Sequence, residues 1–155
     1  MSTTTHTRSI HVDAPVEKVF DHVKDPHHFY EVMSEFPGSR LVGHIKAELT
    51  DVSMTPDGGL GSTWSFKGAL FIFHFDATFT REEYVPNERF VDRNADAGTS
   101  WTFRVDPDET GTTLRMGFTM SSKVPLLDKV EDRLSWDGDG DLDTMLTMFK
   151  KAIET

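Results

Sequence analysis

The chain has 155 residues, enough for one domain with a buried core, and its balance of 37% hydrophobic and 27% charged residues excludes a disordered protein. The net charge is −10 and no basic cluster interrupts it, which argues against nucleic acid as a partner because an acidic surface repels phosphates. The absence of cysteine excludes disulfides, thiolate nucleophiles and cysteine zinc sites.

The N-terminal third predicts a tail, a strand and two helices. Residues 1–7 are polar, and we expect a disordered tail there. The N-terminus also lacks the apolar core of a signal peptide. Ile10 and Val12 alternate with polar residues, which indicates a short strand. Asp13 is expected to cap the following helix. Pro15 is compatible with the first turn of this helix, because the N–H that proline lacks would be unpaired there anyway. A second short helix is expected from His27 to Met33.

The middle of the chain predicts a series of strands. Glycine-containing or proline-containing turns separate segments in which apolar and polar residues alternate, which is typical of β-structure. The clearest strand covers residues 70–82, where odd-numbered positions up to Phe79 are aromatic or small. Residues 99–106 and 112–121 alternate in the same way. Strands with one apolar and one polar face indicate an antiparallel meander, and the flanking helices indicate an α+β protein.

The C-terminal part predicts a short helix over residues 125–134 and a final amphipathic helix. The apolar residues of this last helix recur at helical spacing from Leu142 to Ile153. No apolar run is long enough to cross a bilayer, so we expect no stable membrane insertion and a soluble, cytoplasmic protein.

Four alternating aspartates, residues 137, 139, 141 and 143, precede the last helix and raise the question of a calcium loop. An EF-hand counted from Asp137 needs glycine at its sixth position and glutamate at its twelfth, where this chain has Leu142 and Met148. Acidic residues are instead favourable at a helix start, so Asp139 or Asp141 is expected to cap the helix.

Other motifs for metal or catalytic chemistry are weak. Three histidines at positions 22, 27 and 28 lie near Asp21 and Asp25, but no histidine pair has i, i+4 spacing, which favours a polar helix junction over a metal site. No nucleophile elbow is present. The glycines at residues 58–61 lack the lysine and helix of a phosphate loop, so they indicate a hairpin turn. We expect neither a metal nor a cofactor.

Several segments resemble one known family. SIHVDAPVEKVFDHVKDP, GGLGSTWSF, TSWTFRVDPDETGTTLRMGF and LDTMLTMFKKAIE are similar to the opening, the glycine hairpin, the last hairpin and the closing helix of the START-like (SRPBCC) superfamily, in its bacterial polyketide cyclase/dehydrase and lipid-transport branch. The resemblance covers residues 8–154. It implies a single helix-grip domain over residues 8–155.

The helix-grip fold is an α+β fold in which a curved seven-stranded antiparallel sheet wraps around a long C-terminal helix. Two short helices follow the first strand, and an apolar cavity lies between sheet and helix. Residues 36–47 are longer than is usual in this family, which predicts a lid.

Within that resemblance the cavity wall can be assigned to inward positions of the strands and of the last helix. The apolar wall is expected to comprise Trp64, Phe66, Phe73, Phe75, Trp101, Phe103, Met116, Phe118, Leu142, Met145 and Phe149. The polar candidates are Tyr30, Asp92 and Arg93, because the register of residues 89–94 is ambiguous.

These expectations favour the binding or carriage of a hydrophobic small molecule, such as a lipid, a fatty acid or a polyketide-like aromatic compound. Two alternatives stay open. The same cavity could serve a polyketide cyclase, aromatase or dehydratase, which would need a buried titratable pair. The aromatic residues could also form a filled core in a non-catalytic interaction or stress module. The sequence leaves the catalytic residues and the oligomeric state open.

Overall fold

The computed structural model describes residues 2–35, 46–70, 73–96, 98–122 and 138–155. The helix expected over residues 125–134, and the lid expected over residues 36–47 apart from its last two residues, lie outside these ranges. No helix in the described ranges is both long and apolar enough to cross a membrane.

The described residues form one antiparallel sheet and three helices, which confirms the predicted helix-grip α+β fold. The strands lie side by side in the order β1-β7-β6-β5-β4-β3-β2. Their bounds are Ser2–Val12 (β1), Lys46–Ser53 (β2), Thr63–Leu70 (β3), Phe73–Val85 (β4), Arg89–Asn94 (β5), Thr99–Pro107 (β6) and Thr112–Ser122 (β7). The helices are Val16–Val23 (α1), Pro26–Glu35 (α2) and Gly138–Glu154 (α4).

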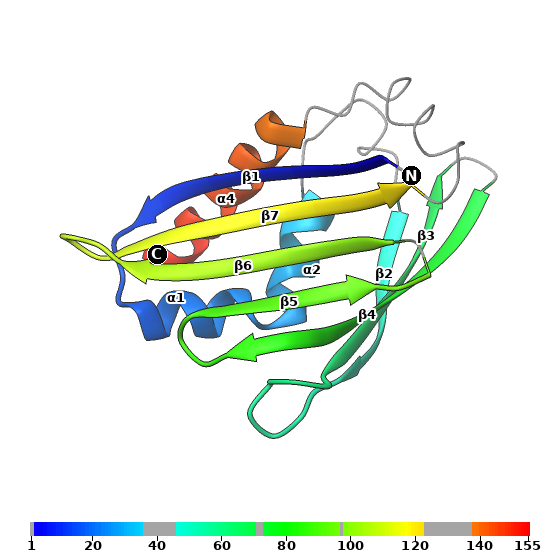
Figure 1. Cartoon of the computed structure of the whole chain (residues 1–155), viewed down its shortest axis with the longest axis horizontal. Coiled ribbons are helices and arrows are strands. Elements are labelled where there is room, and N and C mark those ends of the chain that lie inside the picture. The colour runs from blue at the N-terminus through cyan, green and yellow to red at the C-terminus, as the bar shows by residue number, and fades with distance from the viewer. Residues whose placement is uncertain (1, 36–45, 71–72, 97, 123–137) are drawn as a thin grey trace.

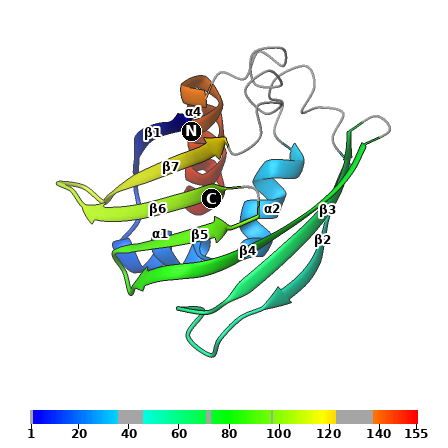
Figure 2. The same cartoon turned by 45° about the vertical axis from the view of Figure 1, so that its right-hand side comes forward.

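The sheet curves around the helices and leaves its other face to solvent. Figure 1 shows α1, α2 and α4 on one side of the sheet, with α4 along β1 and β7. Figure 2 shows β2, β3 and β4 bending forward, so that the sheet has a concave face toward the helices. Because side chains alternate along a strand, every second residue points into this concave face, except where the register shifts in β2 and β4.

The N-terminal residues belong to the sheet, so the prediction of a disordered tail is wrong from Ser2 onward. Residues Ser2 to Val12 pair antiparallel with β7, from Ser2 opposite Ser122 to Val12 opposite Thr112. Residues 3–5 and 7 are threonines, whose β-branched side chains favour extended backbone. An edge strand with a largely polar sequence carries no apolar alternation, so the pattern used for the other strands fails there.

Two helix starts differ from the sequence prediction. Pro15 is the N-cap of α1 and no side chain among the described residues caps this helix, while Asp13 instead hydrogen-bonds the ring of His11. Helix α4 already begins at Gly138, which places Asp139 and Asp141 inside its first turn rather than at its cap. Their carboxylates still face the positive end of the helix dipole, which is the stabilising effect that the aspartate pattern predicted.

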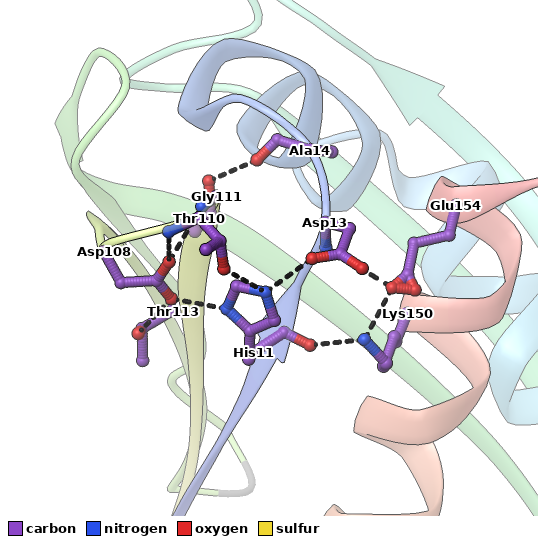
Figure 3. A network of polar contacts seen from close by, with 10 residues as sticks. His11, Asp13, Ala14, Asp108, Thr110, Gly111, Thr113, Lys150 and Glu154 are labelled. Carbon is purple, nitrogen blue, oxygen red and sulfur yellow. Dashed lines mark hydrogen bonds and ion pairs between the residues drawn. The ribbon is translucent and has the colours of Figure 1, made fainter.

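A polar network at one end of the sheet fixes the C-terminal end of α4 (Figure 3). His11 lies between two carboxylates, with Nδ1 at 2.7 Å from Asp108 and Nε2 at 2.7 Å from Asp13. The hydrogen bond to Asp108, and then that to Asp13, raises the pKa of His11, and the same contact lowers the pKa of Asp108. Lys150 of α4 donates to the main-chain oxygen of His11 at 2.8 Å. Helix α4 is thereby held along β1 at this end.

Candidate functional site

The predicted wall residues largely meet on the concave face. Buried together in one hydrophobic cluster are Trp64, Trp101, Phe103, Met116, Phe118, Leu142, Met145 and Phe149. Phe66 is half-buried and packs against this cluster, and Tyr30 is also half-buried. The side chains of Phe73 and Phe75 lie outside the described part of the structure.

The register of β5 separates the two adjacent polar candidates. Asp92 lies directly opposite Trp101 in β6 and is buried. Arg93 points to the outer face, where its side chain is 51% exposed and its Nη1 lies 3.8 Å from Glu82. The expectation that Arg93 faces the cavity is therefore wrong, because adjacent residues of a strand point to opposite faces and Asp92 occupies the inward one.

Phe29 of α2 fills the middle of the concave face. Its ring centroid lies 5.3 Å from that of Trp64, 5.0 Å from that of Trp101 and 6.1 Å from that of Phe103. These tilted and edge-on contacts are the preferred geometries of aromatic pairs. The part of the concave face that Phe29 covers is therefore packed core rather than open space.

Beyond Phe29, apolar side chains of the same concave face are only partly covered. Phe66 in β3 lies opposite Ala77 in β4 and Leu49 in β2, so all three share one side of the sheet. We call the following residues the half-buried apolar set: Met33, Leu49, Val52, Phe66, Ala77, Met120 and Met148. They come from α2, β2, β3, β4, β7 and α4. This set is the part of the concave face on which an apolar ligand could still bury surface.

A buried charge pair on the concave face was missed by the sequence analysis. Arg81 of β4 lies opposite Asp92 of β5, and its Nε and Nη2 donate to the two carboxylate oxygens at 2.8 and 3.0 Å. The side chains are only 1% and 4% exposed. Arg81 has the same parity as Phe79 in its strand, so extending the alternation by one step would have placed it inward.

The hydrogen-bonding groups of this pair are taken up by protein partners. Trp64 Nε1 donates to Asp92 at 2.9 Å. Arg81 also donates to the main-chain oxygens of Gly58 at 2.6 Å and Lys24 at 2.9 Å, and its guanidinium lies 4.1 Å from the ring centroid of Phe90. The pair therefore joins the end of α1 and the β2–β3 turn to the sheet. Its role in the described structure is positional, because each side-chain nitrogen of Arg81 and each carboxylate oxygen of Asp92 already has a hydrogen-bond partner in the protein.

The histidines around the first helix boundary form a polar helix junction. The rings of His22 and His28 stack with centroids 3.8 Å apart, and His28 Nδ1 hydrogen-bonds the main-chain oxygen of His22 at 2.8 Å. Burial, and then the neighbouring His28, lowers the pKa of His22. Within the described ranges, no three histidine or acidic side chains are grouped as metal ligands would be.

The fold and its apolar concave face define a helix-grip ligand-binding domain, and comparison with known proteins agrees. Residues 3–154 match the family model described as polyketide cyclase / dehydrase and lipid transport. The chain therefore belongs to this family of the SRPBCC type. No match was found among curated proteins.

Solved structures with the same fold are distant in sequence. The solution structure of the KanY protein is 15% identical, with a TM-score of 0.66 and 100% of both chains covered. A protein from Chromobacterium violaceum is 17% identical, with a TM-score of 0.60 over 97% of this chain and 98% of that one. The Polyketide_cyc-like protein from Corynebacterium glutamicum is 17% identical, with a TM-score of 0.54 over 99% and 90%. At these identities the likeness establishes the fold alone.

Proposed function

We propose that the protein binds a hydrophobic small molecule, such as a lipid, a fatty acid or a polyketide-like aromatic compound, between the concave face of the sheet and α4. The half-buried apolar set is the observation that carries this proposal. Buried neighbours such as Trp64, Phe118 and Met145 would form the floor beneath the ligand. A cytoplasmic location belongs to the same proposal, since a chain without cysteine needs no oxidising compartment.

The expected affinity follows from apolar burial. Each 100 Å² of apolar surface removed from water contributes about 2.5 kcal/mol, and association costs part of this gain. A naphthalene-sized ligand that covers part of the half-buried apolar set is therefore expected to bind with a Kd on the order of micromolar. Binding and carriage need no proton transfer, which fits an Arg81–Asp92 pair whose bonds are all made within the protein.

Replacing Phe66 by glutamate tests the proposal. The carboxylate would have to lose its hydration beneath an apolar ligand, so we expect 2-methylnaphthalene to bind at least tenfold more weakly. Because Phe66 is only half-buried, the folded protein should tolerate this change. Ligand titrations followed by tryptophan fluorescence report binding, since Trp64 stacks on Phe66 with centroids 5.9 Å apart.

The matched control is Val91→Glu, a half-buried apolar position in β5 whose side chain lies on the outer face of the sheet, between the inward Phe90 and Asp92. This variant should bind 2-methylnaphthalene as the wild type does. Equal affinities for wild type and Phe66→Glu would contradict a ligand on the concave face. The aromatic residues would then be a filled core, as in the non-catalytic alternative.

A further inference from the structure

One ring nitrogen of His6 is buried and has no hydrogen-bonding partner among the described residues. It lies in β1 directly opposite Phe118 of β7, on the concave side of the sheet. Its Nδ1 lies 3.3 Å from a carboxylate oxygen of Asp139 in the first turn of α4. Its Nε2 is shielded from solvent and has no hydrogen-bond partner within the described residues.

Such a nitrogen has a cost that calls for an explanation. Burying a polar atom without a partner destabilises the folded state by about 1–3 kcal/mol, so nearly all buried polar atoms are paired. Asp92, on the same face of the sheet, follows that rule, since it receives hydrogen bonds from Trp64 and Arg81. His6 is an exception to the rule that buried polar atoms are paired. It lies in the same line of cross-strand partners as Asp92, which runs from His6 through Phe118 and Trp101.

The contact with Asp139 decides what Nε2 can do. A ring nitrogen that faces a carboxylate carries the proton and donates it, so the neutral imidazole has its proton on Nδ1. Nε2 then presents a lone pair and can only accept. The group that would satisfy it is a hydroxyl or an N–H, whereas a hydrocarbon would leave it unpaired.

The position of His6 places this acceptor next to the apolar residues. The inward row that begins with His6 in β1 continues through Phe118 in β7 and Trp101 in β6. Met120 of the half-buried apolar set lies two residues after Phe118 on the same side of β7, within the reach of diagonal neighbours on a sheet. A ligand that covers Met120 would therefore lie beside His6, and its polar atom would reach Nε2 by displacing the atoms that shield this nitrogen.

We propose that His6, oriented by Asp139, accepts a hydrogen bond from a hydroxyl group of the apolar ligand. This inference rests on the proposed function and narrows its ligand class to hydroxyl-bearing apolar molecules, such as phenols, over plain hydrocarbons. Asp139 is a positioning residue in this arrangement, since it holds the ring and its tautomer without reaching the ligand.

The test compares 2-naphthol with 2-methylnaphthalene, which have nearly the same shape and differ by a hydroxyl against a methyl group. We expect His6→Phe to lower the affinity for 2-naphthol about tenfold relative to the affinity for 2-methylnaphthalene. This factor corresponds to the free energy of one buried hydrogen bond. The control Thr5→Val, on the outer side of the same strand, should leave the ratio at its wild-type value. Using the ratio removes general effects of a variant on the site.

A second measurement needs no variant. In the wild-type protein, 2-naphthol should shift the ¹⁵N resonance of His6 Nε2 in the direction expected when this nitrogen starts to accept a hydrogen bond. The addition of 2-methylnaphthalene should not cause this shift. If both compounds bind, but the ratio is the same in His6→Phe and the resonance does not respond, the role of His6 is overturned and the proposed function stands. If neither compound binds the wild type, both proposals are overturned.

Discussion

Replacing Arg81 by methionine is expected to lower the free energy of unfolding by about 3–5 kcal/mol, because it leaves the Asp92 carboxylate buried without its cation. The main-chain oxygens of Gly58 and Lys24 would lose their donor in the same step. Methionine fills a similar volume, so the loss would come from unpaired polar groups rather than from a cavity. Urea denaturation followed by circular dichroism measures the change.

Arg93→Met is the matched control for this prediction. Arg93 carries the same charge and lies on the outer face, so its replacement should change the stability by no more than about 0.5 kcal/mol. Removing both partners in Arg81→Met/Asp92→Leu should cost less than the sum of the single changes, because no charge is left unpaired. A loss below about 1 kcal/mol for Arg81→Met would contradict a buried pair.

Replacing Phe29 by alanine is expected to lower the free energy of unfolding by about 3–5 kcal/mol as well, the usual cost of removing a buried phenylalanine ring. Phe29 of α2 is 4% exposed, and its ring contacts those of Trp64, Trp101 and Phe103. Its loss would leave a cavity between α2 and the sheet. Thermal and urea unfolding of the variant provide the measurement.

Leu60→Ala is the control, because it removes a large apolar side chain from a position where no cavity would be left. Leu60 is 63% exposed in the β2–β3 turn, so its truncation should have little effect on stability. If Phe29→Ala unfolds at the same urea concentration as Leu60→Ala, then α2 does not pack on the sheet as described. A loss of the predicted size would show that the middle of the concave face is closed by protein side chains.

The inward side of the central strands could be predicted from the sequence because alternation along a strand is a local property. Trp101 and Phe103 are separated by Thr102, and Met116 and Phe118 by Gly117, and each pair is buried as the pattern predicts. The fold followed from the order of these strands and helices, together with the segments that resemble the family. Such arguments depend on apolar residues and work where one face is buried.

Polar members of the concave face were harder to predict because they break the pattern that identifies the face. Arg81 has the parity of Phe79 but was not assigned inward, since arginine is seldom buried unless it is paired. The choice between Asp92 and Arg93 depends on the pairing of β5 with β4, where the register shifts between Arg81 and Glu83. A single sequence does not reveal such a bulge.

His6 was missed for a different reason. The threonine-rich start of the chain has no apolar alternation, and only pairing with β7 makes it a strand. Its contact with Asp139 joins residues 133 positions apart. No local pattern contains that information, because it depends on how α4 lies along β1.

The most direct test of the central proposal is to follow ¹³C-labelled methionine methyl resonances while 2-methylnaphthalene is added to the wild-type protein. A ligand on the concave face should shift the methyl signals of Met33, Met120 and Met148, which belong to the half-buried apolar set. Met54, in the chain between β2 and β3, should respond least. Saturable shifts in these three methionines would support an apolar ligand site between sheet and α4. No shifts, or shifts confined to Met54, would contradict it.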